Sequence, residues 1–118
     1  MMSKNFYLGK NSLIVNLRGE IDQYAAAQLK SNIDIEIENS PKKNLIFDLK
    51  EVTLMDSSGI GLIVGRYKLV TSLGGKMMLC NASESVFKML RLSGIQKVVD
   101  IYETLADAEK SLSKQKGR

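Results

Sequence analysis

Residues 45–49 read Leu-Ile-Phe-Asp-Leu, and the rest of the chain can be organised around this short, nearly continuous apolar run. A strand that is buried on both faces of a parallel sheet has this composition, because neither side meets water. Residues 58–73 follow with apolar residues at helical spacing and stop at a Gly-Gly pair. Residues 76–80 then form a second apolar run. A strand, a helix and a strand in this order predict a parallel unit with a right-handed crossover.

The segment before this unit predicts two strands, at residues 5–8 and 12–17. Gly-Lys-Asn separates them, and glycine and asparagine at such a break suit a hairpin turn. After the unit, the sequence predicts a helix at residues 84–92, a strand at 97–101 and a last helix at 104–112.

Residues 22–39 are ambiguous between helix and strand. Asp22 is a candidate helix N-cap, and Asn-Ser-Pro at residues 39–41 is a stop signal. Ile33, Ile35 and Ile37 alternate as they would in a strand, but the preceding stretch is rich in alanine. We therefore predict a helix here.

These elements predict an α/β fold in one domain of residues 1–118, with a mostly parallel mixed β-sheet, an opening β-hairpin and about four helices. A basic, flexible tail is expected from about residue 112. In such sheets the functional loops lie at the carboxyl ends of the strands, and the loop after residue 49 is one of them.

The composition excludes several kinds of site. The 118 residues include no histidine, which rules out a His-based catalytic triad or metal ligand. Cys80 is the single cysteine, so a zinc site is not expected and no intramolecular disulfide can form. It lies in an apolar run, where a free cysteine behaves as a small hydrophobe. We expect no metal and no catalytic residues.

Charge and targeting signals indicate a cytoplasmic protein. No signal peptide or membrane span is recognisable. The net charge is +4 and the pI about 9.2, with much of the excess in the tail at Lys110, Lys114, Lys116 and Arg118. No aromatic-interleaved basic patch accompanies these residues, so neither nucleic acid nor a membrane is expected as a partner.

Residues 55–61 read Met-Asp-Ser-Ser-Gly-Ile-Gly and connect the buried strand to the next helix. One interpretation is a capping turn, since aspartate and serine oxygens accept the free N–H groups of a first helical turn. The other is a phosphorylation site, because a helix N-terminus accommodates a phosphate. Gly59 and Gly61 would leave the serines accessible; close helix–sheet packing is the alternative, especially for Gly61 and Gly65.

Enzymatic motifs do not fit this loop. Its glycines do not form the phosphate-binding G-x-x-x-x-G-K-[ST] loop, and neither serine lies in G-x-S-x-G. The chain is therefore not expected to be an enzyme.

Three segments resemble the anti-anti-sigma factors of the STAS-domain family: residues 55–68, the Arg-Gly-Glu-Ile-Asp at 18–22 and the Leu-Ser-Gly-Ile at 92–95. The resemblance implies a partner switch. The unphosphorylated chain would bind SpoIIAB, an anti-sigma factor and serine kinase, and release sigma-F for sporulation. SpoIIAB would use ATP to phosphorylate Ser57, and the phosphatase SpoIIE would reverse this, so the chain itself needs no cofactor. The alternatives are an RsbV-like role in a stress-response pathway, a stressosome scaffold and a transporter's regulatory domain.

The resemblance also implies a partner-binding surface around Ser57. The matching positions are Asp22, Ser58, Gly59, Ile60, Gly61 and Arg66. For Asp22 the alternative role is the helix cap, and for Arg66 it is a solvated position on a helix. Residues 23–25, Gln-Tyr-Ala, depart from the more polar family pattern.

Overall fold

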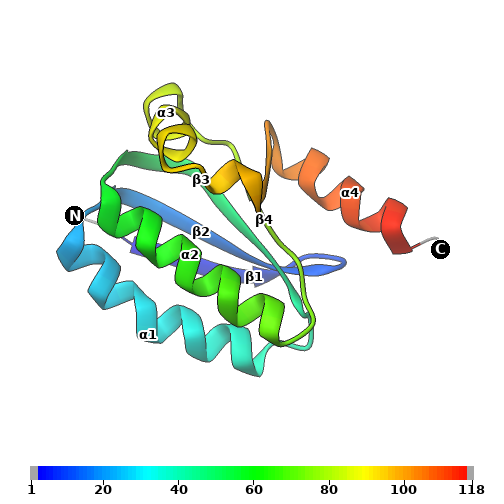
Figure 1. Ribbon diagram of the computed structural model, residues 1–118. Coiled ribbons are helices and arrows are strands. Elements are labelled where there is room, and N and C mark those ends of the chain that lie inside the picture. The colour runs from blue at the N-terminus through cyan, green and yellow to red at the C-terminus, as the bar shows by residue number, and fades with distance from the viewer. Residues whose placement is uncertain (1–2, 117–118) are drawn as a thin grey trace.

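The computed structural model describes residues 3–116 and contains one five-stranded sheet in the order β1-β2-β3-β4-β5 (Figure 1). Only β1 is antiparallel to its neighbour, and the other three pairs are parallel. The predicted α/β fold with a mixed sheet and four α-helices is confirmed. The elements are β1 (Ser3–Leu8), β2 (Ser12–Ile21), α1 (Gln23–Asn39), β3 (Asn44–Met55), α2 (Ser57–Ser72), β4 (Met77–Cys80), α3 (Glu84–Ser93), the 3-10 helix η1 (Ile95–Lys97), β5 (Asp100–Tyr102) and α4 (Leu105–Lys116).

The opening hairpin forms as predicted. Leu8 of β1 pairs with Leu13 of β2, and the Gly9 N–H donates to the Ser12 carbonyl over 2.8 Å to close the turn. The α1 segment is a helix, with Leu29, Ile33 and Ile37 buried along one side. The apparent strand alternation of its isoleucines arises because Ile35 lies on the exposed side of the same helix.

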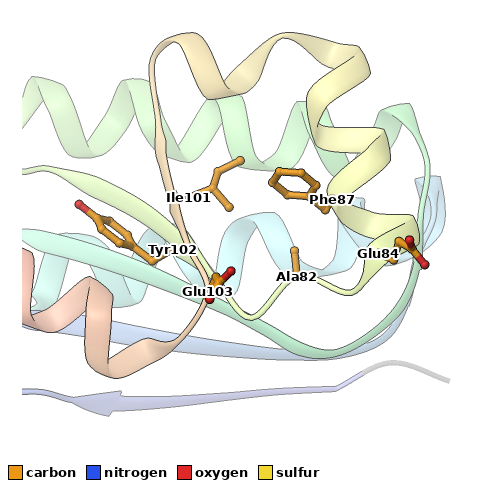
Figure 2. Close-up of a pocket in the computed structure, with 6 residues that line it drawn as sticks. All are labelled: Ala82, Glu84, Phe87, Ile101, Tyr102 and Glu103. Carbon is orange, nitrogen blue, oxygen red and sulfur yellow. The ribbon is translucent and has the colours of Figure 1, made fainter.

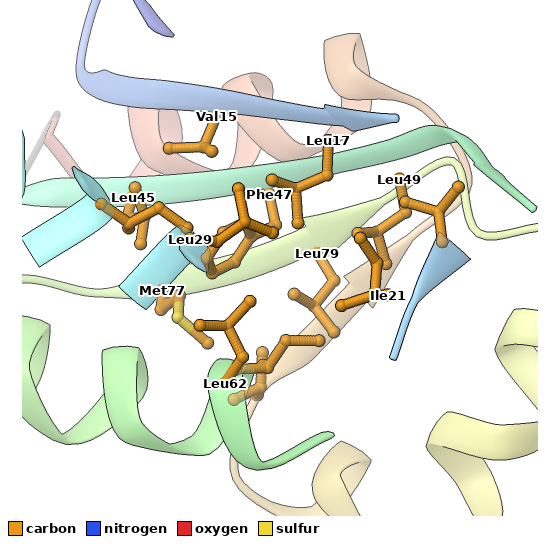
Figure 3. Packing of buried hydrophobic residues seen from close by; sticks show 14 of the residues in the cluster. Val15, Leu17, Ile21, Leu29, Leu45, Phe47, Leu49, Leu62, Met77 and Leu79 are labelled. Atoms are coloured by element: carbon orange, nitrogen blue, oxygen red, sulfur yellow. The ribbon is translucent and has the colours of Figure 1, made fainter. Parts of the chain in front are cut away.

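The two faces of the sheet carry separate apolar clusters. In the larger cluster, Leu17, Phe47 and Leu79 from neighbouring strands pack against Leu29 of α1 and Leu62 of α2 (Figure 3). Helix α3 contributes to the same cluster, so α1, α2 and α3 cover one face. On the other face, Ile14, Ile46, Met78 and Cys80 meet Ala108 and Leu112 of α4. Because successive residues of a strand point to opposite faces, the apolar runs of β3 and β4 supply both clusters.

Strands β2 and β3 are longer than the sequence predicts, ending at Ile21 and Met55 rather than at residues 17 and 49. Beyond Asp48, which pairs with Cys80, β3 pairs only with β2 in the described part of the chain. Residues 50 and 51 are exposed there, so the apolar pattern is lost although the strand continues. The register also shifts next to Gly19, whose φ of +95° suits glycine.

Two boundaries at the end of the chain also differ from the prediction. Strand β5 begins at Asp100 rather than residue 97, because Gly94 adopts a left-handed conformation and η1 occupies the next three residues. Helix α4 continues to Lys116, past the expected end at residue 112. The flexibility of the basic tail stays a prediction, and Arg118 lies outside the described residues.

Candidate functional site

Helices α1 and α2 begin side by side at the same edge of the sheet (Figure 1). Ile21 and Met55 are partners at the ends of the parallel strands β2 and β3. Each is followed at once by an aspartate, Asp22 or Asp56, and then by a helix. The Asp56 N–H also donates to the Ile21 carbonyl over 3.4 Å. Strand pairing therefore brings the Asp22 region and the Ser57 loop together, as the resemblance implied.

Asp22 is the N-cap of α1, which confirms the capping role. Its backbone is extended, with φ −96° and ψ −171°, and its Oδ1 accepts from the Ala25 N–H over 2.9 Å. The residue is exposed, and it directly follows Ile21, the strand partner of Met55. Asp22 can therefore cap α1 and also lie beside the Ser57 loop.

Asp56, and neither serine, caps α2. Its Oδ1 accepts from the Ser58 N–H over 2.8 Å, and its carbonyl accepts from the Gly59 and Ile60 N–H groups over 3.0 and 3.2 Å. Ser57 is the exposed first residue of the helix, one residue before the predicted start. Among the side chains described, those of residues 4–113, the hydroxyls of Ser57 and Ser58 have no hydrogen-bond partner. A capping turn accounts for Asp56 but leaves the Ser57 hydroxyl available for chemistry.

The glycines near the serines have different surroundings. A Cβ on the buried Gly59 would lie 2.4 Å from the Met55 Cγ and 3.2 Å from the Ile21 carbonyl oxygen, so close packing explains this residue. A Cβ on Gly61 or Gly65 would meet nothing within 4 Å. The packing explanation is therefore wrong for Gly61 and Gly65. Gly61 is exposed one turn after Ser57, where its missing side chain keeps the helix surface open.

Arg66 does not lie on the surface around Ser57. It is 6% exposed, and its Nε lies 2.7 Å from Oδ1 of Asp34 on α1, a charge contact without hydrogen-bond alignment. The solvated role is wrong, and so is direct placement on the contact surface. Because the pair joins α1 to α2, Arg66 instead holds the two helices together. Ile60, also predicted as a contact, is half-buried against the larger core cluster.

Two exposed apolar side chains close in sequence to Asp22 and Asp56 are missed by sequence reasoning. Tyr24, in the first turn of α1, is 73% exposed, and Leu54, near the end of β3, is 55% exposed. Leu54 gives no clear signal, because a register shift beside Gly19 and Glu20 interrupts the alternation of β3. Tyr24 falls in the segment that departs from the family pattern, and that departure is the available signal.

Cys80 is buried, as its apolar run predicts. Burial raises the pKa of its thiol to about 12, with the nearby Asp48 and Glu109 carboxylates adding to the shift. The thiol is therefore protonated at neutral pH, which makes it a poor nucleophile. None of the helices in residues 3–116 is both long enough and apolar enough to cross a membrane.

Comparisons with known proteins agree with this arrangement. The STAS domain model matches residues 5–108. The chain is 36% identical over 96 residues to the anti-sigma F factor antagonist of Paenibacillus polymyxa, covering 81% of this chain and 82% of the relative. It is also 36% identical over 92 residues to the anti-sigma-B factor antagonist of Bacillus subtilis, covering 78% and 83%. The structure of SpoIIAA in its unphosphorylated form matches with a TM-score of 0.80 and 25% identity, covering 95% of this chain and 97% of SpoIIAA.

The chain therefore belongs to the STAS-domain family, among its anti-sigma factor antagonists. The partner of such a protein is an anti-sigma factor.

Proposed function

We propose that this chain, acting in the cytoplasm as a single domain, antagonises the anti-sigma factor of sporulation. Unphosphorylated, it binds the anti-sigma factor and serine kinase SpoIIAB, which releases sigma-F and starts sporulation-specific transcription. SpoIIAB then uses ATP to phosphorylate Ser57, which ends the interaction, and the phosphatase SpoIIE restores it. The chain is a substrate in this cycle and performs no chemistry of its own.

The observation that carries this proposal is the exposed Ser57 hydroxyl at a helix start that Asp56 already caps. A kinase needs a hydroxyl that can reach its active site, and Gly61 leaves the neighbouring helix surface open. The positive end of the α2 dipole accommodates the charge of a phosphate. A relative with the corresponding function, the anti-sigma F factor antagonist of Paenibacillus polymyxa, is 36% identical.

The proposed contact surface surrounds Ser57. It consists of Asp22, Ser58, Ile60 and Gly61, with the buried Gly59 beneath them, and we add the exposed side chain of Tyr24, two residues after Asp22. Tyr24 supplies apolar area of the kind that a specific protein interface has at its centre. Arg66 contributes indirectly, by tying α1 to α2 through Asp34.

A role in a stress-response sigma pathway, as in RsbV, is the second candidate. The anti-sigma-B factor antagonist of Bacillus subtilis has the same 36% identity as the sigma-F relative. Both candidates use the same surface and the same phosphorylation, and they differ in the anti-sigma factor that is bound.

A kinase assay would separate these possibilities. The purified chain is incubated with ATP and with each candidate kinase in turn, SpoIIAB or the anti-sigma-B factor. We expect the cognate kinase to phosphorylate wild type and Ser58→Ala but not Ser57→Ala, as located by mass spectrometry. Phosphate on Ser58 or Ser93 would contradict the assignment of Ser57. Pull-down of the anti-sigma-B factor alone would replace the sporulation role with the stress-response role.

A further inference from the structure

A second concave surface lies at the carboxyl ends of β4 and β5. Two neighbouring cavities of about 360 and 530 Å³ share Ile101, Tyr102 and Glu103. We call the combined surface the β5 groove. Its first part is lined by Ala82, Glu84, Phe87, Ile101, Tyr102 and Glu103 (Figure 2), and its second part reaches Asp107 and Lys110 on α4.

The β5 groove is separate from the Ser57 surface. It lies at the level of Cys80, whose partner on β3 is Asp48. Ser57 follows the far end of β3, after Met55. At about 3.3 Å per strand residue, the distance along β3 from Asp48 to Met55 is about 23 Å. The residues that line the groove are therefore distinct from those around Ser57.

The floor of the β5 groove is apolar. Phe87 of α3 lies beside Ile101 of β5, and Ala82 lies between Glu84 and Glu103 (Figure 2). Phe87 remains 40% exposed, a large apolar surface for a side chain at the start of a helix. The ring face of Phe87 can support the methylene stem of a lysine or attract a cation.

Carboxylates surround this floor. Three carboxylates line the groove, those of Glu84, Glu103 and Asp107, whereas Lys110 is the single basic residue among the lining residues. Among the side chains of residues 4–113, the ion pairs are Arg18–Glu51, Arg66–Asp34 and Lys76–Asp100, and none of them includes a groove carboxylate. In a chain with a net charge of +4, this is a local concentration of negative charge.

We propose that the β5 groove binds a basic segment of a protein partner, with lysine or arginine on both sides of an apolar residue. The basic side chains meet Glu84, Glu103 and Asp107, and the apolar side chain covers Phe87 and Ile101. Charge complementarity selects this occupant, because an acidic or purely apolar segment would leave the carboxylates unpaired or repelled. The edge strand β5 offers backbone groups to an extended segment.

The test is an amide NMR titration of the full chain with the pentapeptide acetyl-Lys-Leu-Lys-Leu-Lys-amide. We expect saturable shifts at Ala82, Phe87, Ile101 and Glu103, with a dissociation constant of about 1 mM. The peptide in which glutamate replaces each lysine should cause none. Basic-peptide shifts spread over Asp22, Asp56 and other exposed acidic residues, or no saturation, would overturn the proposal.

Matched variants distinguish peptide binding at the β5 groove from nonspecific electrostatic attraction to the whole chain. Glu84→Gln/Glu103→Gln should weaken peptide binding about fivefold, as expected for two exposed ion pairs. The control Glu36→Gln/Glu38→Gln makes the same change in net charge on α1 and should bind as wild type does. Equal weakening in both double variants would refute the site. Both should retain normal phosphorylation of Ser57, so failure here is distinguishable from failure of the proposed function.

Discussion

The starts of α1 and α2 have the same backbone arrangement but different side chains. Each follows the end of a paired strand, at Ile21 or Met55, and each has an extended aspartate as its N-cap. After Asp22 the chain continues with Gln-Tyr-Ala-Ala, and after Asp56 with Ser-Ser-Gly-Ile-Gly. Both sequences make a stable helix start. The serines and Gly61 of α2 are therefore not required by capping or by packing.

The comparison separates structure from function within one short loop. Asp56 and Gly59 have structural roles, because one caps the helix and the other fits against Met55 and Ile21. Ser57 and Gly61 are exposed, and neither fills a packing or hydrogen-bonding role. Glycine lowers helix stability by about 1 kcal/mol relative to alanine, so keeping Gly61 has a cost that access to Ser57 explains.

The largest effect on stability is expected at Gly59. Gly59→Val should lower the free energy of unfolding by about 2–3 kcal/mol, because the new side chain would overpack against Met55 and the Ile21 backbone. Gly61→Val should change it by less than about 0.5 kcal/mol, since the space there is open and valine is the better helix former. Thermal and urea unfolding of both variants would measure this.

The matched assay is phosphorylation by the cognate kinase. Gly61→Val should impair phosphorylation or anti-sigma factor binding although the protein folds normally, because the side chain would stand on the contact surface. Normal kinetics in a fully folded Gly61→Val protein would show that Gly61 does not provide access to Ser57.

A smaller effect separates the two roles of Asp22. Asp22→Ala should lower the free energy of unfolding by about 1 kcal/mol, whereas Asp22→Asn should change it by only a few tenths, because asparagine caps as well as aspartate. Asp22→Asn nevertheless removes the charge beside Ser57. In the proposed function, the unmodified protein binds the anti-sigma factor more tightly than the phosphorylated protein does. We expect Asp22→Asn to make the ratio of these two affinities about fivefold smaller.

Isothermal titration of both forms of each variant would measure this ratio. An unchanged ratio in Asp22→Asn, together with the expected loss of stability in Asp22→Ala, would leave Asp22 with the capping role alone.

Local signals predict much of this molecule. The element order, the opening hairpin and the Asp22 cap follow from spacing and turn residues close in sequence. The ends of β2 and β3 do not, because their last residues lie beyond β4 and have an exposed face that removes the apolar pattern. The burial of Arg66 depends on Asp34, a partner on another helix. Gly59 and Gly61 have different roles because only Gly59 lies on the side of α2 that meets the sheet. The sequence does not show this, because both residues are glycine.

The smallest effect on the fold is expected from charge at Ser57 itself. A phosphoserine adds about −1.5 to −2 charges at pH 7. Negative charge at a helix N-terminus is stabilised by about 0.3–1 kcal/mol, and here the nearby Asp22 and Asp56 carboxylates oppose that gain. Ser57→Asp should therefore change the free energy of unfolding by no more than about 0.5 kcal/mol. It should nevertheless bind the anti-sigma factor far more weakly than Ser57→Ala does.

The reason for this contrast is where the charge is placed. Ser57 is exposed in the free protein, so water solvates an added charge and the sheet has no cause to rearrange. In the complex the same charge would be buried against a partner and beside an already acidic rim, which costs desolvation and repulsion. Amide NMR shifts between Ser57→Ala and Ser57→Asp should be confined to the start of α2 and the region of Asp22. Shifts extending through β4, β5 and α4 would mean that the switch is a change of conformation, because local charge at an exposed helix start cannot reach those elements.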